Sequence, residues 1–278
     1  TWTMGTDGTF LGDSGADHTL KLATSFGTIG IGNSGDAANA VDDITPTAFE
    51  EAEYAANTGY IDISALAGNG SNLIRYGNEF FGWAVDASYN PRYGSGDGNA
   101  DDAPTGTTSG DWGEVYEIAL KGNPLAIAGI DGVSMSLGYG ETEGIANNRA
   151  DAEMGFVALT YAYGPLTVGA QKSAVSYGNQ GTGKEAATNW AKNTNIGVAL
   201  AVNDNLSVSY QETESQKHFT NGLGITTDSS ANNESTILEA DTISIAYTVG
   251  GLSIKYAESS VDNDTYSVGT SADKSTLS

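Results

Sequence analysis

Residues 241–259, DTISIAYTVGGLSIKYAES, alternate between apolar and polar side chains on both sides of a Gly-Gly pair. Side chains of a β-strand point to opposite faces in turn, and glycine tolerates the positive φ that tight hairpin turns need. The stretch therefore predicts a β-hairpin with one apolar and one polar face. The kind of protein depends on what covers the apolar face, which is either a protein core or lipid.

The same alternation recurs along the chain. Further apolar alternations lie at residues 20–22, 29–31, 74–76, 83–89, 116–120, 133–139, 157–163, 166–168, 196–202 and 206–210, with a fragment at Trp2 and Met4 and a last one beginning at DKSTLS. They predict an all-β chain of about fourteen strands. The best helix candidate is residues 45–59, TPTAFEEAEYAANTG, with Thr45 as a possible cap.

The connections between these strands fall into two kinds. Short turns are expected at residues 25–28, 77–82, 163–166, 203–205 and 249–251, and long polar segments at 33–71, 90–112, 141–151, 177–193, 212–238 and 260–271. One connection in a short-turn position, residues 121–132, is longer. If successive strands are antiparallel, all short turns lie at one end, as in a transmembrane β-barrel, and a soluble sandwich has no reason to segregate its loops.

The two faces of the strands also favour lipid over a protein core. The positions that alternate with the apolar ones carry Ser, Thr, Gly, Ala, Asn, Lys, Arg and Asp, residues that suit the water-filled lumen of a barrel. Aromatic residues recur at strand ends, where their rings would lie at the membrane interface: Tyr76, Trp83, Tyr89, Tyr116, Tyr139, Tyr163, Tyr210 and Tyr247. A soluble β-sandwich with one wet face is the alternative. Lys172 breaks the outward apolar phase, so either a bulge precedes it or that end of the strand has left the membrane.

Composition narrows the function. The chain has 278 residues with 11 Lys+Arg against 35 Asp+Glu, a formal charge of −24, which argues against nucleic acid as a partner. There is no cysteine, so disulfides and thiolate metal sites are excluded. No apolar run is long enough for a transmembrane helix. The start, TWTMGTDG, has no signal-peptide features, so we expect any such peptide to have been removed.

Four segments resemble the alphaproteobacterial general porins. They are FGTIGIGNSGDAANAVDD (26–43), NLIRYGNEFFGWAVDASYNP (72–91), YEIALKGNPLAIAGIDGVSMSLGYGETEG (116–144) and YGPLTVGAQKSAVSYG (163–178). The resemblance implies one barrel domain over residues 1–278, sixteen strands in the complete protein and a homotrimer in the Gram-negative outer membrane. Family members begin with a full strand and end on an aromatic residue, so we expect this chain, which ends at Ser278, to lack part of the first strand and the last one.

The resemblance also implies a constriction. Residues 34–71 correspond to the loop that folds into the barrel and narrows it, with acidic residues facing basic ones on the wall. The acidic candidates here are Asp36, Asp42, Asp43, Glu50, Glu51 and Glu53. The pore-wall candidates in the inward phase are Lys21, Arg75, Asp86 and Lys255. The family usually carries a richer basic cluster, which weakens the transverse field expected for this chain.

Two enzyme-like motifs fail on inspection. Gly12-Asp13-Ser14-Gly15 matches a serine-protease nucleophile segment, but both histidines, His18 and His218, come after the serine. Residues 178–185, GNQGTGKE, have Glu185 where a phosphate-binding loop needs Ser or Thr. We therefore predict no enzymatic activity.

Residues 97–102, DGNADD, place Asp97, Asn99 and Asp101 at alternate positions, as calcium loops do, but lack the glycine and glutamate of an EF-hand. A looser Ca²⁺ site on the acidic loops is the one cofactor we consider. The sequence thus predicts a passive diffusion channel for small hydrophilic solutes, with a preference for cations. The alternative is a secreted or surface-layer β protein with a structural or adhesive role.

Overall fold

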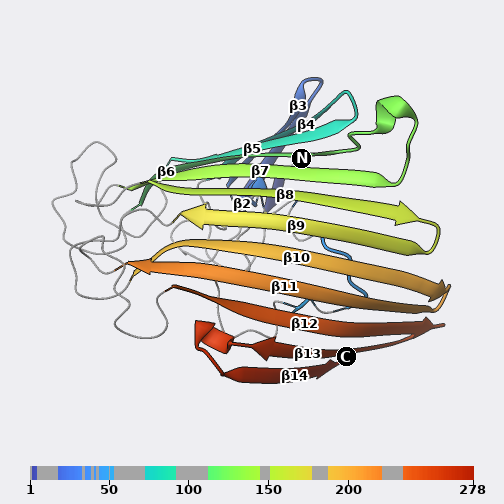
Figure 1. Ribbon diagram of the computed structural model, residues 1–278. Helices are drawn as coiled ribbons and strands as arrows, with labels where there is room; N and C mark the ends of the chain where they lie inside the picture. Colours follow the sequence, from blue (N-terminus) through green and yellow to red (C-terminus); the bar gives the residue numbers. More distant parts are fainter. Residues whose placement is uncertain are drawn as a thin grey trace.

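The computed structural model describes residues 2–4, 18–32, 35–38, 41, 44–49, 51–52, 73–91, 112–144, 151–176, 187–220 and 234–278. Fourteen strands form one antiparallel sheet in which the spatial order follows the chain order (Figure 1). The strands are β1 (Trp2–Met4), β2 (His18–Thr24), β3 (Gly27–Gly32), β4 (Leu73–Phe80), β5 (Trp83–Asn90), β6 (Trp112–Gly122), β7 (Val133–Gly144), β8 (Ala152–Tyr163), β9 (Leu166–Ser176), β10 (Ala187–Asn203), β11 (Leu206–Thr220), β12 (Glu234–Val249), β13 (Leu252–Asp262) and β14 (Ser271–Leu277). The all-β antiparallel fold predicted from the sequence is confirmed.

The hairpin predicted at residues 241–259 is present as β12 and β13. Tyr247 pairs with Ile254 and Val249 with Leu252, and only Gly250 and Gly251 connect the strands. Gly250 has φ 58°, the left-handed conformation that such a turn requires. Local alternation and turn chemistry are thus enough to set the register here.

The connections segregate to the two ends as predicted, but residues 187–193, 212–220 and 234–238, expected in long polar segments, belong to strands β10, β11 and β12. Two residues join β2 to β3, β4 to β5, β8 to β9, β10 to β11 and β12 to β13, whereas β6 and β7 are joined by a longer connection that contains the short 3-10 helix η3 (Ala126–Ala128). The strand ends that these connections join lie at one end of the sheet (Figure 1), and because successive strands are antiparallel, the strand ends that the longer segments join lie at the other. The end with the longer connections is called the long-loop end below.

The sheet is curved, with β2 passing behind β7 and β8 in the view of Figure 1. Its outer face carries the apolar phase: Ile243 is 55% exposed, whereas the neighbouring Thr242 and Ser244 on the inner face are at most 1% exposed. The exposed apolar side chains of β2 to β13 follow the same phase, and tyrosines of the outer face, such as Tyr139 and Tyr210, are about 41% exposed. A monomeric soluble protein does not leave so continuous an apolar surface uncovered.

Lys172 lies on the outer face without any bulge. The pairing of β9 with β8 and with β10 runs from Leu166 to Ser176 with no register shift. The possibility of a bulge before Lys172 is therefore wrong, and the Lys172 side chain belongs to the outward phase.

The predicted helix at residues 45–59 is wrong for residues 45–49, whereas Ala52 has a 3-10 conformation and residues 53–59 lie outside the described ranges. Residues 45–49 are irregular. The amides of Ala48 and Ala52 donate to side chains of β11 instead of to carbonyls one turn back. Pro46 also disfavours a helical conformation for the residue before it. No helix in the described ranges has both the length and the apolar character needed to cross a membrane.

Candidate functional site

Residues 35–38, 41, 44–49 and 51–52, together called the inner segment below, lie against the inner face of the sheet. Its described parts run as the blue trace behind β10 to β12 in Figure 1. A peptide backbone that leaves the sheet needs other hydrogen-bond partners where it is buried. Two groups of inner-face side chains supply them.

The first group is on β5 and β6. The Ala37 amide donates to Ser88 Oγ at 3.0 Å, and the Ala38 amide donates to Glu117 Oε2 at 3.3 Å. Ser88 Oγ also donates to Glu117 Oε2 at 3.3 Å, and Glu117 is only 2% exposed. A buried carboxylate therefore holds the start of the inner segment.

Apolar contacts strengthen this first attachment. The inner face is not uniformly polar, since β8 and β9 turn larger apolar side chains toward the segment. One buried cluster contains Ala37, Ala38, Val41, Ala119, Met154, Phe156, Val175 and Ala191. Burial of these side chains adds a hydrophobic contribution to the hydrogen bonds at Ser88 and Glu117.

The second group is on β11 and centres on Gln211, which is 3% exposed. Its Nε2 donates to the carbonyls of Thr45 and Pro46 at 3.0 and 3.2 Å, and its Oε1 accepts from the Ala52 amide at 3.0 Å. Ser209 Oγ accepts from the Ala48 amide at 2.8 Å. One glutamine thus joins both ends of residues 45–52 to the wall.

Two wall glycines allow this close approach. A Cβ at Gly169 would lie 2.7 Å from Pro46 Cδ, and a Cβ at Gly197 would lie 2.6 Å from Thr45 Cγ2 and 2.8 Å from the Pro46 carbonyl oxygen. Such distances are shorter than van der Waals contact, so only glycine fits at these positions. The wall on β9 and β10 is shaped to receive the segment.

The charged wall candidates have definite partners. Arg75 on β4 pairs with Asp86 on β5, with Nη2 to Oδ1 at 2.9 Å and Nε to Oδ1 at 3.0 Å. Lys255 Nζ lies 5.3 Å from the centroid of the Phe49 ring, so it contacts the inner segment. Lys21 lies opposite Gly30 in the inward phase of β2. Arg75 and Asp86 therefore neutralise each other on the wall.

A second segment also packs on the inner face, which sequence reasoning did not anticipate. It is the connection between β13 and β14, with the 3-10 helix η4 (Asp264–Tyr266). Tyr266 is 2% exposed, and its hydroxyl lies 2.7 Å from Ser215 Oγ on β11. Tyr266 and Ala52 of the inner segment belong to one cluster with Leu238, Ala240 and Val261. The two segments therefore share a support.

The structure describes only some of the predicted acidic residues. Asp36 is buried and Glu51 is half-buried, and each interacts with other residues. Several predicted residues lie outside the described ranges: Asp42, Asp43, Glu50, Glu53, Asp97, Asn99 and Asp101, and with them residues 12–15 and 178–185. Among the described residues, no group of three His, Asp or Glu side chains is placed to hold a metal ion.

Sequence reasoning missed Glu117, Gln211 and Tyr266 as functional positions. Glu117 and Gln211 stand in the inward phase, where most neighbours are small. A long polar side chain in such a row was the available signal, because it can reach across to a buried backbone. Tyr266 has no comparable signal, since its position depends on the conformation of its loop.

No family model matches the sequence. A search of curated proteins likewise finds no match. Solved porin structures do match. OmpF of Salmonella typhi, in complex with daunomycin, gives a TM-score of 0.60 at 13% identity over 94% of this chain and 77% of that chain. A further porin structure gives 0.56 at 16% identity over 93% and 79%.

An anion-selective porin from Comamonas acidovorans gives a TM-score of 0.57 at 13% identity over 88% of this chain and 66% of that chain. The chain thus spans about two thirds to four fifths of these structures. At these identities the likeness shows the fold alone. The chain has the fold of a porin.

Proposed function

We propose that this chain forms a general diffusion channel in the outer membrane of a Gram-negative bacterium. The observation that carries the proposal is the inner segment, which is held across a largely polar inner face by Ser88, Glu117, Ser209 and Gln211. The opposite face is apolar with tyrosines among its exposed residues. A sheet with lipid outside and a partly obstructed polar lumen inside supports passage of small hydrophilic solutes.

The inner segment is proposed as the constriction. It belongs to the loop of residues 34–71, whose candidate charges are Asp36, Asp42, Asp43, Glu50, Glu51 and Glu53. On the wall, the Arg75 charge is offset by Asp86 at 2.9 Å, which leaves Lys21 and Lys255 as the remaining basic candidates. Acidic groups in a narrow pore raise the local concentration of cations. We therefore propose a cation preference.

The fold does not decide the sign of that preference. The Comamonas protein described above is named as anion-selective, and it shares the fold. The side chains at the constriction carry the selectivity in this proposal. Membership of the alphaproteobacterial general porins, a sixteen-stranded complete protein and a homotrimer rest on the sequence resemblance and belong to the same proposal.

A planar lipid bilayer measurement tests the channel directly. Purified, folded protein should give stepwise, ohmic openings, with closures in groups of three if the trimer is correct, and a cation-selective reversal potential in a KCl gradient. Heat-modifiable oligomers that need detergent are expected as well. Folded protein that stays soluble without detergent and gives no conductance would overturn the channel and favour the surface-layer alternative.

Substitution of the acidic loop residues tests the constriction. The triple variant Glu50→Gln, Glu51→Gln, Glu53→Gln should shift the reversal potential toward zero, because three candidate cation-attracting charges are removed. The matched control replaces Glu153, Glu239 and Glu258, which lie in the exposed outward phase, by Gln and removes the same charge away from the lumen. Equal shifts in both variants would show that the loop carboxylates do not line the constriction.

A further inference from the structure

Two lysines lie side by side on the otherwise apolar and acidic outer face. Lys172 on β9 pairs with Val157 on β8 and with Thr194 on β10, and Lys192 on β10 pairs with Ala174 on β9. They are therefore diagonal neighbours across the β9–β10 pair, and both are exposed. Among the described side chains, these are the only basic ones in the outward phase.

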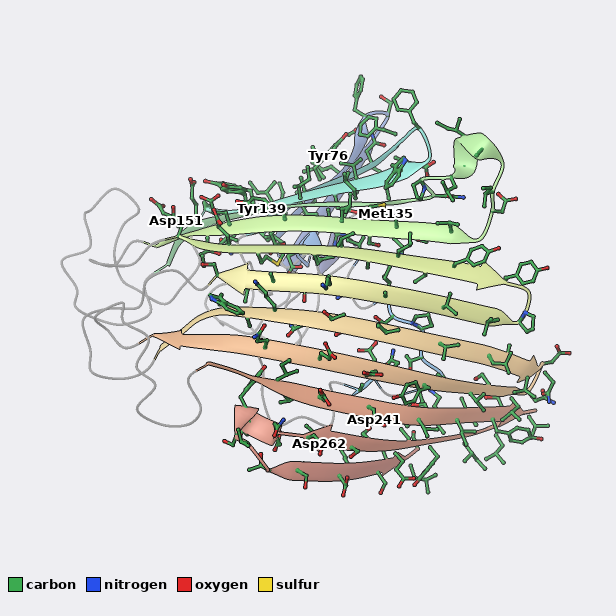
Figure 2. The ribbon with its side chains drawn as sticks, viewed as in Figure 1. Tyr76, Met135, Tyr139, Asp151, Asp241 and Asp262 are labelled. Atoms are coloured by element: carbon green, nitrogen blue, oxygen red, sulfur yellow. The ribbon has the colours of Figure 1, made fainter. Side chains whose placement is uncertain are left out.

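The register gives the level of these lysines relative to the tyrosines. One row of paired residues crosses the sheet through Val133, Tyr161, Val168, Val198 and Tyr210. Tyr139 lies beyond Val133 on β7 toward the long-loop end, and Met135 lies between them (Figure 2). Tyr139 lies six residues beyond this row on β7, whereas Tyr210 lies in the row on β11. A straight line between them therefore crosses β9, the strand midway, three residues beyond Val168, between Ala170 and Lys172. Lys192 lies on the long-loop side of this line.

Interfacial tyrosines mark the boundary between acyl chains and headgroups. Lys172 is therefore at that boundary and Lys192 in the headgroup layer. A long lysine side chain reaches such a position readily, since its stem tolerates apolar surroundings while its ammonium stays in a polar layer. Lys172, which breaks the outward apolar pattern, thus lies where lipid headgroups are expected.

A groove adjoins the two lysines on the outer face. A cavity of about 560 Å³ is lined by Lys172, Lys192, Glu214, Val157 and Ala174, among others. Toward the short turns follows a second hollow of about 380 Å³, lined by Leu159, Ala170, Ile196 and Tyr210 among others. Consecutive outward positions of β8 to β11 line the two, so the hollows follow one another over the small side chains of β9 and are together called the groove. Its lower part is mainly apolar, with Glu212 at its side, and its upper part carries Lys172 and Lys192 with one acidic side chain, Glu214.

The surrounding charges make this place distinct. Acidic side chains stand in the outward phase on both sides of the lysines, namely Glu141 and Glu153 on β7 and β8 and Glu212, Glu214 and Glu239 on β11 and β12. Lys172 forms no ion pair with another described residue, and Lys192 Nζ lies 4.6 Å from the centroid of the Trp190 ring. Two lysines outnumber the one glutamate, Glu214, that lines the same cavity, so an anion in the headgroup layer is attracted here and repelled where only acidic side chains stand.

We propose that Lys172, Lys192 and the adjoining groove bind one lipid whose phosphate headgroup carries a net negative charge. The two ammonium groups hold the phosphate of the headgroup, and an acyl chain lies in the apolar groove over Ala170. The inference rests on the proposed membrane location of the outer face. It adds a lipid-specific site, which passive diffusion through the lumen does not require.

Native mass spectrometry of the full chain in detergent tests the site. Dioleoyl phosphatidic acid is compared with dioleoyl phosphatidylcholine, which has the same acyl chains and no net charge. The wild type should bind phosphatidic acid more tightly. The variant Lys172→Gln, Lys192→Gln should lose roughly 30-fold in that affinity, about fivefold per lysine near a lipid surface, and keep its affinity for phosphatidylcholine.

Two variants control for folding and charge. Lys172→Arg, Lys192→Arg keeps both charges and should retain the preference. Lys121→Gln, Lys274→Gln removes two exposed lysines that pair with Ser136 and Ser259 in the inward phase, and should bind phosphatidic acid like the wild type. Equal binding of both lipids by the wild type would overturn the proposal, as would unchanged binding by the Lys172→Gln, Lys192→Gln variant.

Other occupants give different outcomes. Displacement of phosphatidic acid by inorganic phosphate at an equal concentration would mean that both bind equally well and that the groove contributes nothing, which would overturn the lipid site. A change in oligomeric state with unchanged lipid binding would assign the surface to a second copy of this chain. Bilayer conductance of the same samples separates the two proposals: a conducting protein without lipid preference removes only this inference, and a lipid-selective protein without conductance removes only the channel.

Discussion

The substitution Gln211→Leu should release the inner segment without unfolding the sheet. Leucine has a similar volume but removes the three hydrogen bonds to Thr45, Pro46 and Ala52. At about 1 kcal/mol net for each bond, the local closing free energy falls by about 3 kcal/mol. This corresponds to a roughly hundredfold larger population of the open segment. The strand pairing of β11 with β10 and β12 does not involve this side chain.

Hydrogen exchange followed by mass spectrometry measures the effect. The Ala52 amide should exchange up to about a hundred times faster, the limit reached if it exchanges through opening of the segment. The amides of β11 should keep their rates. In bilayers the open state should appear as larger current noise and a broader conductance distribution.

Gln171→Leu is the matched control. Gln171 is an inner-face glutamine on β9 with 5% exposure, and its Oε1 has no hydrogen-bond partner among the described residues. This variant should leave exchange at Ala52 unchanged. Unchanged exchange in Gln211→Leu, or equal acceleration in both variants, would refute the role of Gln211 as the attachment of the segment.

Three further outcomes are expected. Gly197→Ala should weaken the attachment of the inner segment by about 1–3 kcal/mol, because the new Cβ would lie 2.6 Å from Thr45 Cγ2 and overpack the contact. The amides of residues 44–49 should then exchange faster. Gly155→Ala, whose Cβ would have no neighbour nearer than 3.6 Å, should leave their exchange unchanged. Arg75→Gln should shift the reversal potential toward stronger cation preference, because the charge of Asp86 is no longer neutralised. Asp86→Asn should shift it in the opposite direction. Equal reversal potentials of the two variants would place the pair outside the ion path. Millimolar Ca²⁺ should raise the melting temperature relative to chelator if the acidic loops hold the ion, and identical melting curves would exclude that site.

Much of the wall could be predicted from the sequence because its rules are local. Alternation at Ile243 and Ile245 decides which face is outward, and Gly250-Gly251 sets the hairpin register. Both depend on neighbours in the chain, so reading along it is enough. The loop segregation follows in turn, since antiparallel strands bring every second connection to the same end.

The interior could be predicted only in part. The resemblance pointed to residues 34–71 as an inward loop, but not to the residues that hold it. The Ala48 amide meets Ser209 across 161 residues of sequence, and the Ala37 amide meets Ser88 across 51. The expected helix is absent from residues 45–49 because Gln211 and Ser209 offer the backbone other partners. Local propensity does not include such contacts.

The sequence by itself thus determined the strands, their two faces and the ends at which they turn, because period two and turn chemistry act between neighbours. Only the tertiary structure decided that Glu117, Gln211 and Tyr266 hold segments on the inner face, and that Lys172 and Lys192 meet on the outer one. The physical reason is that these neighbours depend on strand register and on how the segments fold back onto the sheet, and local preferences along the chain include neither.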